Sequence, residues 1–228
     1  CLSLAFVVLV QGAWAQTFQE RSTSASQVRM SVTNVGTFGN AFRGYRDGTG
    51  TPSCEYPAGS GTEHLFESGV WVGGIDAGGT SWRCAVFEGK DTILARTSFP
   101  TTTPAETLAR AIAFFSGQKE QGQAVSRIGI ACFGPLAVNP ASPRWGHILA
   151  TTKPNWSGTD VAGQMAAGTG CSIALETDVT AAAFAERAWG AGQGLDDVAY
   201  VTVGTGIGAG IILGGRAVWG TMHPEAGH

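Results

Sequence analysis

The stretch that decides the fold is "VWVGGIDAGGTSWRCAVFEGK", residues 70–90. Two short apolar runs flank the turn Asp76-Ala77-Gly78-Gly79-Thr80. A tight turn between strands needs glycine where φ is positive and where a phosphate must approach the backbone, so we expect positive φ in this turn. Backbone N–H groups and the Thr80 hydroxyl can then donate to phosphate oxygens, and Asp76 can hold a magnesium ion or its waters. The alternative is an ordinary glycine hairpin that happens to contain an aspartate.

The residues after this hairpin alternate between strand and helix patterns. A third strand is expected over residues 92–99, and a helix is expected to begin with Thr103 as N-cap, Pro104 in the first turn and Glu106 three residues after the cap. Further strands are expected at 128–133, 172–176, 198–203 and 208–213, with helices near 159–167 and 180–189. This order predicts an α/β fold with a largely parallel sheet and an antiparallel edge.

A second glycine turn follows a predicted strand at Gly204, Thr205 and Gly206. A dinucleotide-binding fingerprint would need a helix after the glycines, but "AGIILGG" is a strand pattern, so that interpretation is rejected. Two strand-turn-strand grips facing each other across a cleft are typical of actin-like ATPases and sugar kinases. Taken alone, this turn also fits a plain hairpin.

Two further constellations carry chemistry. Asp178 stands where a strand is predicted to end and a helix to begin, a place where a carboxylate can reach a cleft, although a helix N-cap is the ordinary explanation. The stretch "HPEAGH", residues 223–228, suits sugar hydroxyls or a metal ion, and a polar loop is its alternative.

Together these motifs resemble the ROK family of sugar kinases, and within it the bacterial fructokinases, over residues 72–228. "GGIDAGGT" looks like the first phosphate motif, "VTVGTGIGAGII" like the second, and "TDVTAAAFAE" like the segment with the catalytic aspartate. "GIACFGPLAVNP" followed by "TTKPNW" is similar to the fructokinase substrate region, and "HPEAGH" to the sugar- and zinc-binding motif. The resemblance implies an actin-like, ribonuclease H-like kinase lobe with a second lobe that is cut short at His228.

The resemblance also implies roles for individual residues. Asp178 would be the general base; Glu225 would bind the sugar; His228 would be a zinc ligand. The residues implied in ATP phosphate and magnesium binding are Asp76, Gly78, Gly79, Thr80, Gly204, Thr205 and Gly206, and those implied in substrate binding include Gly134 and Pro135. The sequence departs from the family pattern at Ser81, where many relatives have Lys, and at Thr180, where Asn is usual. The family's Zn²⁺ is expected only in a complete chain, and the resemblance allows a homodimer there.

The N-terminal part has a different character. Residues 2–10 form an apolar run of signal-peptide length, too short to span a bilayer, before a small-x-small site at 13–15. A buried strand is the alternative. The stretch "PSCEYPAGSGTEHLFESGVWVGG" resembles the opening of large secreted surface proteins of bacteria, and this resemblance covers roughly residues 16–74. We therefore expect a signal-peptide remnant at 1–15, a secreted-protein-like, β-rich or irregular segment at 16–71, a kinase lobe at 72–190 and the start of a second lobe at 191–228, with a junction of unrelated segments near 71–74.

Composition narrows the classes of function. The 34 glycines and 43% hydrophobic residues of the 228-residue chain indicate a folded, turn-rich protein. A net charge of −3 with no basic patch argues against nucleic-acid binding. Five scattered cysteines without a CxxC pair argue against a disulfide framework. No stable membrane insertion is expected.

The motifs predict ATP-dependent phosphorylation of a hexose, with fructose converted to fructose 6-phosphate, and small-molecule partners limited to the sugar and ATP. The chain as given is expected to be inactive, and the kinase part is expected in the cytoplasm, in conflict with an export signal at residues 1–15. The alternative is a secreted surface or adhesion protein with an inert kinase-like half. A sugar-responsive repressor, another role within the ROK family, would need an N-terminal helix-turn-helix that this sequence does not suggest.

Overall fold

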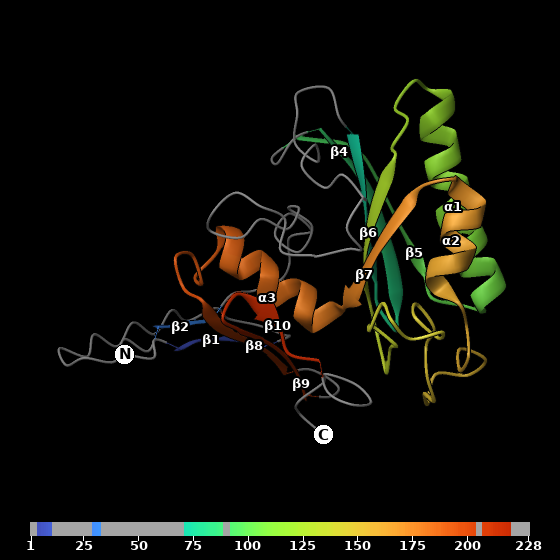
Figure 1. Ribbon diagram of the computed structural model, residues 1–228. Coiled ribbons are helices and arrows are strands. Elements are labelled where there is room, and N and C mark those ends of the chain that lie inside the picture. Colours follow the sequence, from blue (N-terminus) through green and yellow to red (C-terminus); the bar gives the residue numbers. More distant parts are fainter. Residues whose placement is uncertain (1–3, 11–28, 33–70, 89–91, 204–206, 220–228) are drawn as a thin grey trace, which may run out of the picture. The chain divides into compact units, whose positions relative to one another are not determined.

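The computed structural model describes residues 4–10, 29–32, 71–88, 92–203 and 207–219 (Figure 1). The chain divides into two compact units, which are described separately. One unit ends at Asp178, and the other contains the chain from Val179 onward together with the N-terminal strands. The division lies inside the segment 72–190 that we expected as one lobe.

The unit that ends at Asp178 is built on a five-stranded sheet with the strand order β5-β4-β3-β6-β7. Strands β3, β4 and β5 form an antiparallel meander, whereas β6 and β7 run parallel to β3. The predicted α/β fold with an antiparallel edge is therefore confirmed. The bounds are β3 Trp71–Ala77, β4 Ser81–Glu88, β5 Thr92–Pro100, β6 Arg127–Cys132 and β7 Ser172–Thr177.

Two helices, α1 (Pro104–Glu120) and α2 (Val161–Thr169), cover one face of this sheet (Figure 1). Helix α1 begins as predicted, because the Thr103 hydroxyl accepts a hydrogen bond from the Glu106 backbone N–H and Pro104 fills the first position. This satisfies one of the N–H groups that a helix start leaves unpaired. Helix α2 is capped in the same way by Asp160 and ends at Gly170 in the left-handed conformation.

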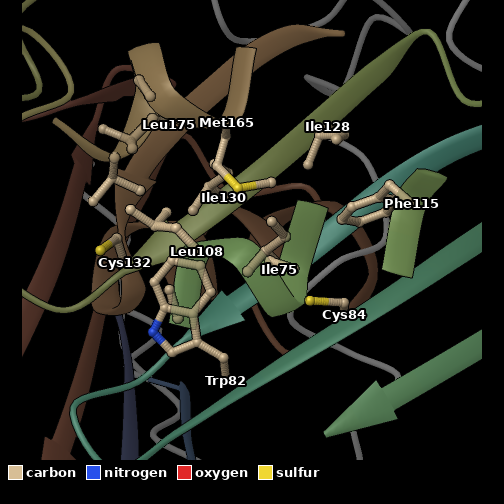
Figure 2. Packing of buried hydrophobic residues seen from close by; sticks show 14 of the residues in the cluster. Ile75, Trp82, Cys84, Leu108, Phe115, Ile128, Ile130, Cys132, Met165 and Leu175 are labelled. Atoms are coloured by element: carbon tan, nitrogen blue, oxygen red, sulfur yellow. The ribbon is translucent and has the colours of Figure 1, made fainter. Parts of the chain in front are cut away.

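The core of this unit lies between the sheet and the two helices (Figure 2). Its fully buried side chains include Ile75 on β3, Ile130 on β6, Leu108 on α1 and Met165 on α2. Gly73 lets α1 approach closely, since a Cβ there would lie 2.7 Å from a Phe115 ring carbon. The sheet face that packs against the helices is thus filled by apolar side chains, which leaves the ends of the strands for chemistry.

The second unit has a five-stranded sheet with the order β10-β9-β8-β1-β2 and the helix α3 (Asp178–Trp189). Buried Phe184 on α3 packs in a small core with Tyr200 and Ile212 of the sheet. The bounds of the strands are β8 Asp197–Val203, β9 Ile207–Leu213, β10 Arg216–Ala217, β1 Leu4–Val10 and β2 Arg29–Val32.

Strand β1 coincides with the apolar run for which the sequence favoured an export signal over a strand. In the structure these residues form a strand. β1 pairs in parallel with β8, with Leu4 opposite Asp197 at one end and Val10 opposite Val203 at the other. β-Branched residues in both segments favour such pairing, and a signal peptide finds no support here. Among the residues described, no helix has the length and apolar character needed to cross a bilayer.

Candidate active site

The carboxyl ends of three parallel strands meet at one edge of the larger unit's sheet. Ala77 at the end of β3 is paired with Cys132 at the end of β6, which is paired with Thr177 at the end of β7. Neighbouring strands are about 4.8 Å apart, and β6 lies between β3 and β7. The carboxyl ends of β3 and β7 therefore lie roughly 10 Å from each other. In open α/β sheets, ligands bind outside this end of the strands. The first glycine turn, the Gly134-Pro135 pair and Asp178 all follow these strand ends directly.

The turn after β3 is held by its own backbone. The Gly78 N–H donates to the Ser81 carbonyl oxygen over 3.0 Å. Our expectation of positive φ was wrong, because neither Gly78 nor Gly79 has a φ in the left-handed region. Glycine is required at position 78 by close approach instead, since a Cβ would lie 2.9 Å from the Ser81 carbonyl oxygen. At Gly79 a Cβ would meet nothing within 4 Å, and Thr80 is exposed. The space beside Gly79 is therefore open to a ligand.

Thr101 supports this turn from the end of β5 and was not singled out from the sequence. Its hydroxyl donates to the Gly78 carbonyl oxygen over 2.7 Å, and its N–H donates to the Thr80 carbonyl oxygen over 2.9 Å. The side chain is buried, with 8% exposed. No local pattern marks Thr101, since the contact spans 23 residues of chain.

Asp76 lies on the sheet face opposite α1 and α2, because the neighbouring side chains Ile75 and Ala77 are in the core. Its Oδ2 accepts a hydrogen bond from Arg83 Nη1 across the β3–β4 hairpin. The two atoms are 3.0 Å apart, and the two side chains form an ion pair. Burial raises the pKa of the Asp76 carboxyl, and the charge of Arg83 opposes that rise. Arg83 was also missed, although the register of a short hairpin places it directly opposite Asp76.

The segment that follows β6 is tied to the same edge. The Phe133 N–H continues the ladder by donating to the Ala77 carbonyl oxygen over 2.9 Å, and Gly134 and Pro135 come next, joined by a cis peptide bond. Farther along this segment, buried Trp156 donates its indole N–H to the Thr102 carbonyl oxygen over 2.9 Å. Thr102 is adjacent to Thr101. The predicted substrate region and the glycine turn therefore share one support.

Asp178 is the first residue of α3 and is half-buried. A carboxylate in the first turn of a helix is stabilised by the helix dipole, so the helix-start role remains open beside a catalytic one. The carboxylates of Asp178 and Asp76 both act on the buried Cys132 thiol, whose pKa is raised by burial first and by these two charges in addition. The structure thus brings both predicted carboxylates to the same edge of the sheet.

Several predicted residues lie outside the described part of the chain. These are the second glycine turn and the C-terminal motif residues: Gly204, Thr205, Gly206, Glu225 and His228. Of the flanking positions, Gly210 on β9 allows close packing with α3, because a Cβ there would overlap the Val179 backbone. Among the described residues, no three His, Cys, Asp or Glu side chains come together as a metal site.

Comparisons with known proteins agree with this architecture. The profile of the ROK family matches residues 72–228. The fructokinase of Zymomonas mobilis is 43% identical over 157 residues, which cover 68% of this chain and 52% of that protein. The fructokinase of Streptococcus mutans is 38% identical over 156 residues, which cover 68% of this chain and 52% of that protein. The chain thus spans about half the length of the curated relatives it matches.

Solved structures of ROK family proteins are also similar to this chain. The ROK hexokinase from Thermus thermophilus superimposes with a TM-score of 0.57 at 32% identity, covering 68% of this chain and 50% of that one. A ROK family glucokinase from Streptomyces griseus, solved in complex with glucose and AMPPNP, superimposes with a TM-score of 0.58 at 29% identity, covering 69% of this chain and 48% of that one.

Proposed function

The chain belongs to the ROK family, and from this premise we propose that it is the catalytic part of an ATP-dependent hexose kinase that phosphorylates fructose. The fructose assignment rests on the curated relatives at 43% and 38% identity, which are fructokinases. The glucokinase neighbour with bound glucose and AMPPNP supports a sugar and a nucleotide as ligands of the same fold.

The observation that carries the proposal is the position of two carboxylates at one sheet edge. Asp76 precedes the glycine turn at the end of β3, and Asp178 follows β7 two strands away. The strand ends that carry them lie roughly 10 Å apart, and we propose that a phosphoryl group and an attacking hydroxyl bind at this edge. A plain glycine hairpin would not require a carboxylate at the matching end of a strand 100 residues later in the chain.

In the proposed mechanism each group has one task. The backbone N–H groups of Gly79 and Thr80, with the Thr80 hydroxyl, donate to phosphate oxygens of ATP. Asp178 accepts the proton of the sugar hydroxyl while that oxygen forms its bond to the γ-phosphorus and the bond from the γ-phosphorus to ADP breaks. Gly134 and Pro135 shape the sugar side of the site. A phosphate-binding role of the second glycine turn, Gly204, Thr205 and Gly206, stays a prediction.

Magnesium fits the donor set at this edge. Mg²⁺ is usually held by one or two carboxylates together with substrate phosphates and water, and Asp76 is a half-exposed carboxylate beside the turn. When bound, the ion would neutralise charge that develops on the phosphate oxygens. The zinc role of His228 stays a prediction, since His228 lies outside the described residues. A homodimer also stays a prediction.

The test is Asp178→Asn in a protein in which residues 73–228 are continued by the second lobe of a homologous kinase. The substitution keeps the size of the side chain but removes its ability to accept a proton. We expect kcat for fructose phosphorylation to fall on the order of 10²- to 10⁴-fold, while KM for fructose changes little. ADP release is measured with fructose, glucose and mannose as substrates. Asp160→Asn is the matched control, because Asp160 caps α2 and Asn caps helices equally well.

A near-normal kcat in the Asp178→Asn protein would reduce Asp178 to a helix-start residue and remove the proposed general base. Wild-type protein that phosphorylates glucose with a higher kcat/KM than fructose would overturn the fructose assignment but leave the hexose kinase in place.

A further inference from the structure

Arg83 is a charged residue of this edge that the proposed mechanism does not use. It sits on β4, in the register position opposite Asp76, so the two side chains project from the same face of the sheet. Its Nη1 lies 3.0 Å from Asp76 Oδ2. Two residues earlier on β4 is Ser81, which closes the glycine turn through its carbonyl oxygen. Arg83 therefore links the Asp76 carboxylate to the strand that leaves the turn.

The exposure of this ion pair argues for more than a structural contact. The Arg83 side chain is 42% exposed and that of Asp76 is 28% exposed. Ion pairs with this much solvent contact contribute little to stability. A guanidinium carries five N–H donors in a rigid fork, and within the described part of the chain its contact with Asp76 uses Nη1. Because 42% of the Arg83 side chain is exposed, a ligand can reach its remaining donors from solvent.

The chemistry of the guanidinium selects the kind of ligand that these donors would take. Arginine binds carboxylates and phosphates through parallel N–H donors, and such charge-assisted hydrogen bonds are stronger than neutral ones. Asp76 already takes one nitrogen and holds the group in place. A phosphate approaching the open side of Gly79 would meet the other nitrogens of a guanidinium that has lost part of its side-chain freedom in advance.

We propose that Arg83 is a positioning residue of the phosphate site: one guanidinium nitrogen holds the Asp76 carboxylate, and the others donate to phosphate oxygens of the bound nucleotide. The inference rests on the proposed kinase function, and it adds a cationic phosphate contact to a turn for which the sequence suggested backbone donors, one hydroxyl and Asp76.

The test compares MgATP binding to the wild type, Arg83→Gln, Arg83→Lys and Arg110→Gln by isothermal titration calorimetry, each with residues 73–228 continued by the second lobe of a homologous kinase. Arg110 is the matched control, because it also forms a half-exposed ion pair, with Glu106 on α1 at 2.7 Å. Loss of one charge-assisted contact should weaken MgATP binding of Arg83→Gln about tenfold. Arg83→Lys should recover part of the affinity, since lysine keeps the charge but not the fork.

Steady-state kinetics give a second readout that separates phosphate binding from a general structural effect. KM for MgATP should rise about tenfold in Arg83→Gln, while KM for fructose and the melting temperature stay near the wild-type values. MgATP affinity of Arg83→Gln within about twofold of the wild type, or an equal loss in Arg110→Gln, would overturn the role of Arg83 and leave the kinase function standing. Wild-type protein that binds no MgATP would overturn both.

Discussion

Alanine substitutions at Gly78 and Gly79 separate a glycine needed for packing from a glycine needed for a ligand. Both residues belong to one turn, and both changes add one methyl group. At Gly78 the new Cβ would lie 2.9 Å from the Ser81 carbonyl oxygen, which is backbone and cannot rotate away. At Gly79 no atom lies within 4 Å of the new Cβ. The structure therefore predicts opposite effects on stability from two adjacent, chemically identical substitutions.

The magnitude follows from the contacts that Gly78→Ala disturbs. Relieving the overlap moves the turn and strains the hydrogen bonds from Gly78 N–H to Ser81 and from Thr101 to the Gly78 carbonyl oxygen, at 3.0 and 2.7 Å. Overpacking costs about 1–3 kcal/mol, so the melting temperature should fall by about 2–12 °C for a chain of this size. Gly79→Ala should be neutral or stabilising by up to about 1 kcal/mol, because alanine reduces the entropy of the unfolded chain.

MgATP affinity should be lowered in Gly79→Ala, the variant whose stability is expected to be unchanged or increased. If phosphate oxygens approach the open side of Gly79, its methyl group occupies their place, and MgATP affinity should fall at least about tenfold although the fold is intact. Differential scanning calorimetry and titration calorimetry on the same samples measure the two quantities. Unchanged MgATP affinity in Gly79→Ala would refute the phosphate role of the turn, and unchanged stability in Gly78→Ala would refute the turn geometry described above.

Two further predictions concern the support of the site and its thiols. Thr101→Val removes the hydroxyl that donates to the Gly78 carbonyl oxygen and should lower the free energy of unfolding, measured by urea denaturation, by about 1 kcal/mol. Thr101→Ser keeps the hydroxyl and should retain most of the wild-type stability. Equal losses in the two variants would show that the hydroxyl is not the cause. Burial raises the pKa of the Cys84 and Cys132 thiols, so the folded state keeps protons that the unfolded state loses above about pH 8.5. The contribution of these two thiols to stability should therefore be constant below that pH and fall above it, by up to about 1.4 kcal/mol per pH unit for each thiol. A Cys84→Ala, Cys132→Ala double variant whose alkaline loss equals that of the wild type would contradict this assignment.

Local features of the site were predictable because the forces behind them act over a few residues. The start of α1 follows from the Thr103 hydroxyl reaching a backbone N–H three residues away and from proline at the first helical position. The β3–β4 hairpin follows from two apolar runs around a glycine turn. The register of this hairpin places Asp76 opposite Arg83. The Asp76–Arg83 ion pair was therefore predictable from the sequence, although it was not predicted.

The reason for glycine in the turn was not predictable in the same way. Sequence reasoning expected glycine for its positive φ, but Gly78 is needed because the Ser81 carbonyl oxygen occupies the place of its Cβ. That carbonyl lies beside the pairing of Ala77 with Trp82, and the carbonyl oxygen of the preceding residue, Thr80, accepts the N–H of Thr101, which follows β5. A steric requirement of this kind depends on atoms from three strands.

The sequence by itself determined the α/β class, the family and the candidate carboxylates, since these depend on periodicity and on short motifs. Tertiary structure decided that Asp76 and Asp178 share one edge, because parallel pairing of β3, β6 and β7 joins segments separated by more than 30 residues and no local pattern sets that register. It also decided that residues 4–10 form a strand, since the same apolar run suits an export signal until β8 supplies a partner for its backbone hydrogen bonds.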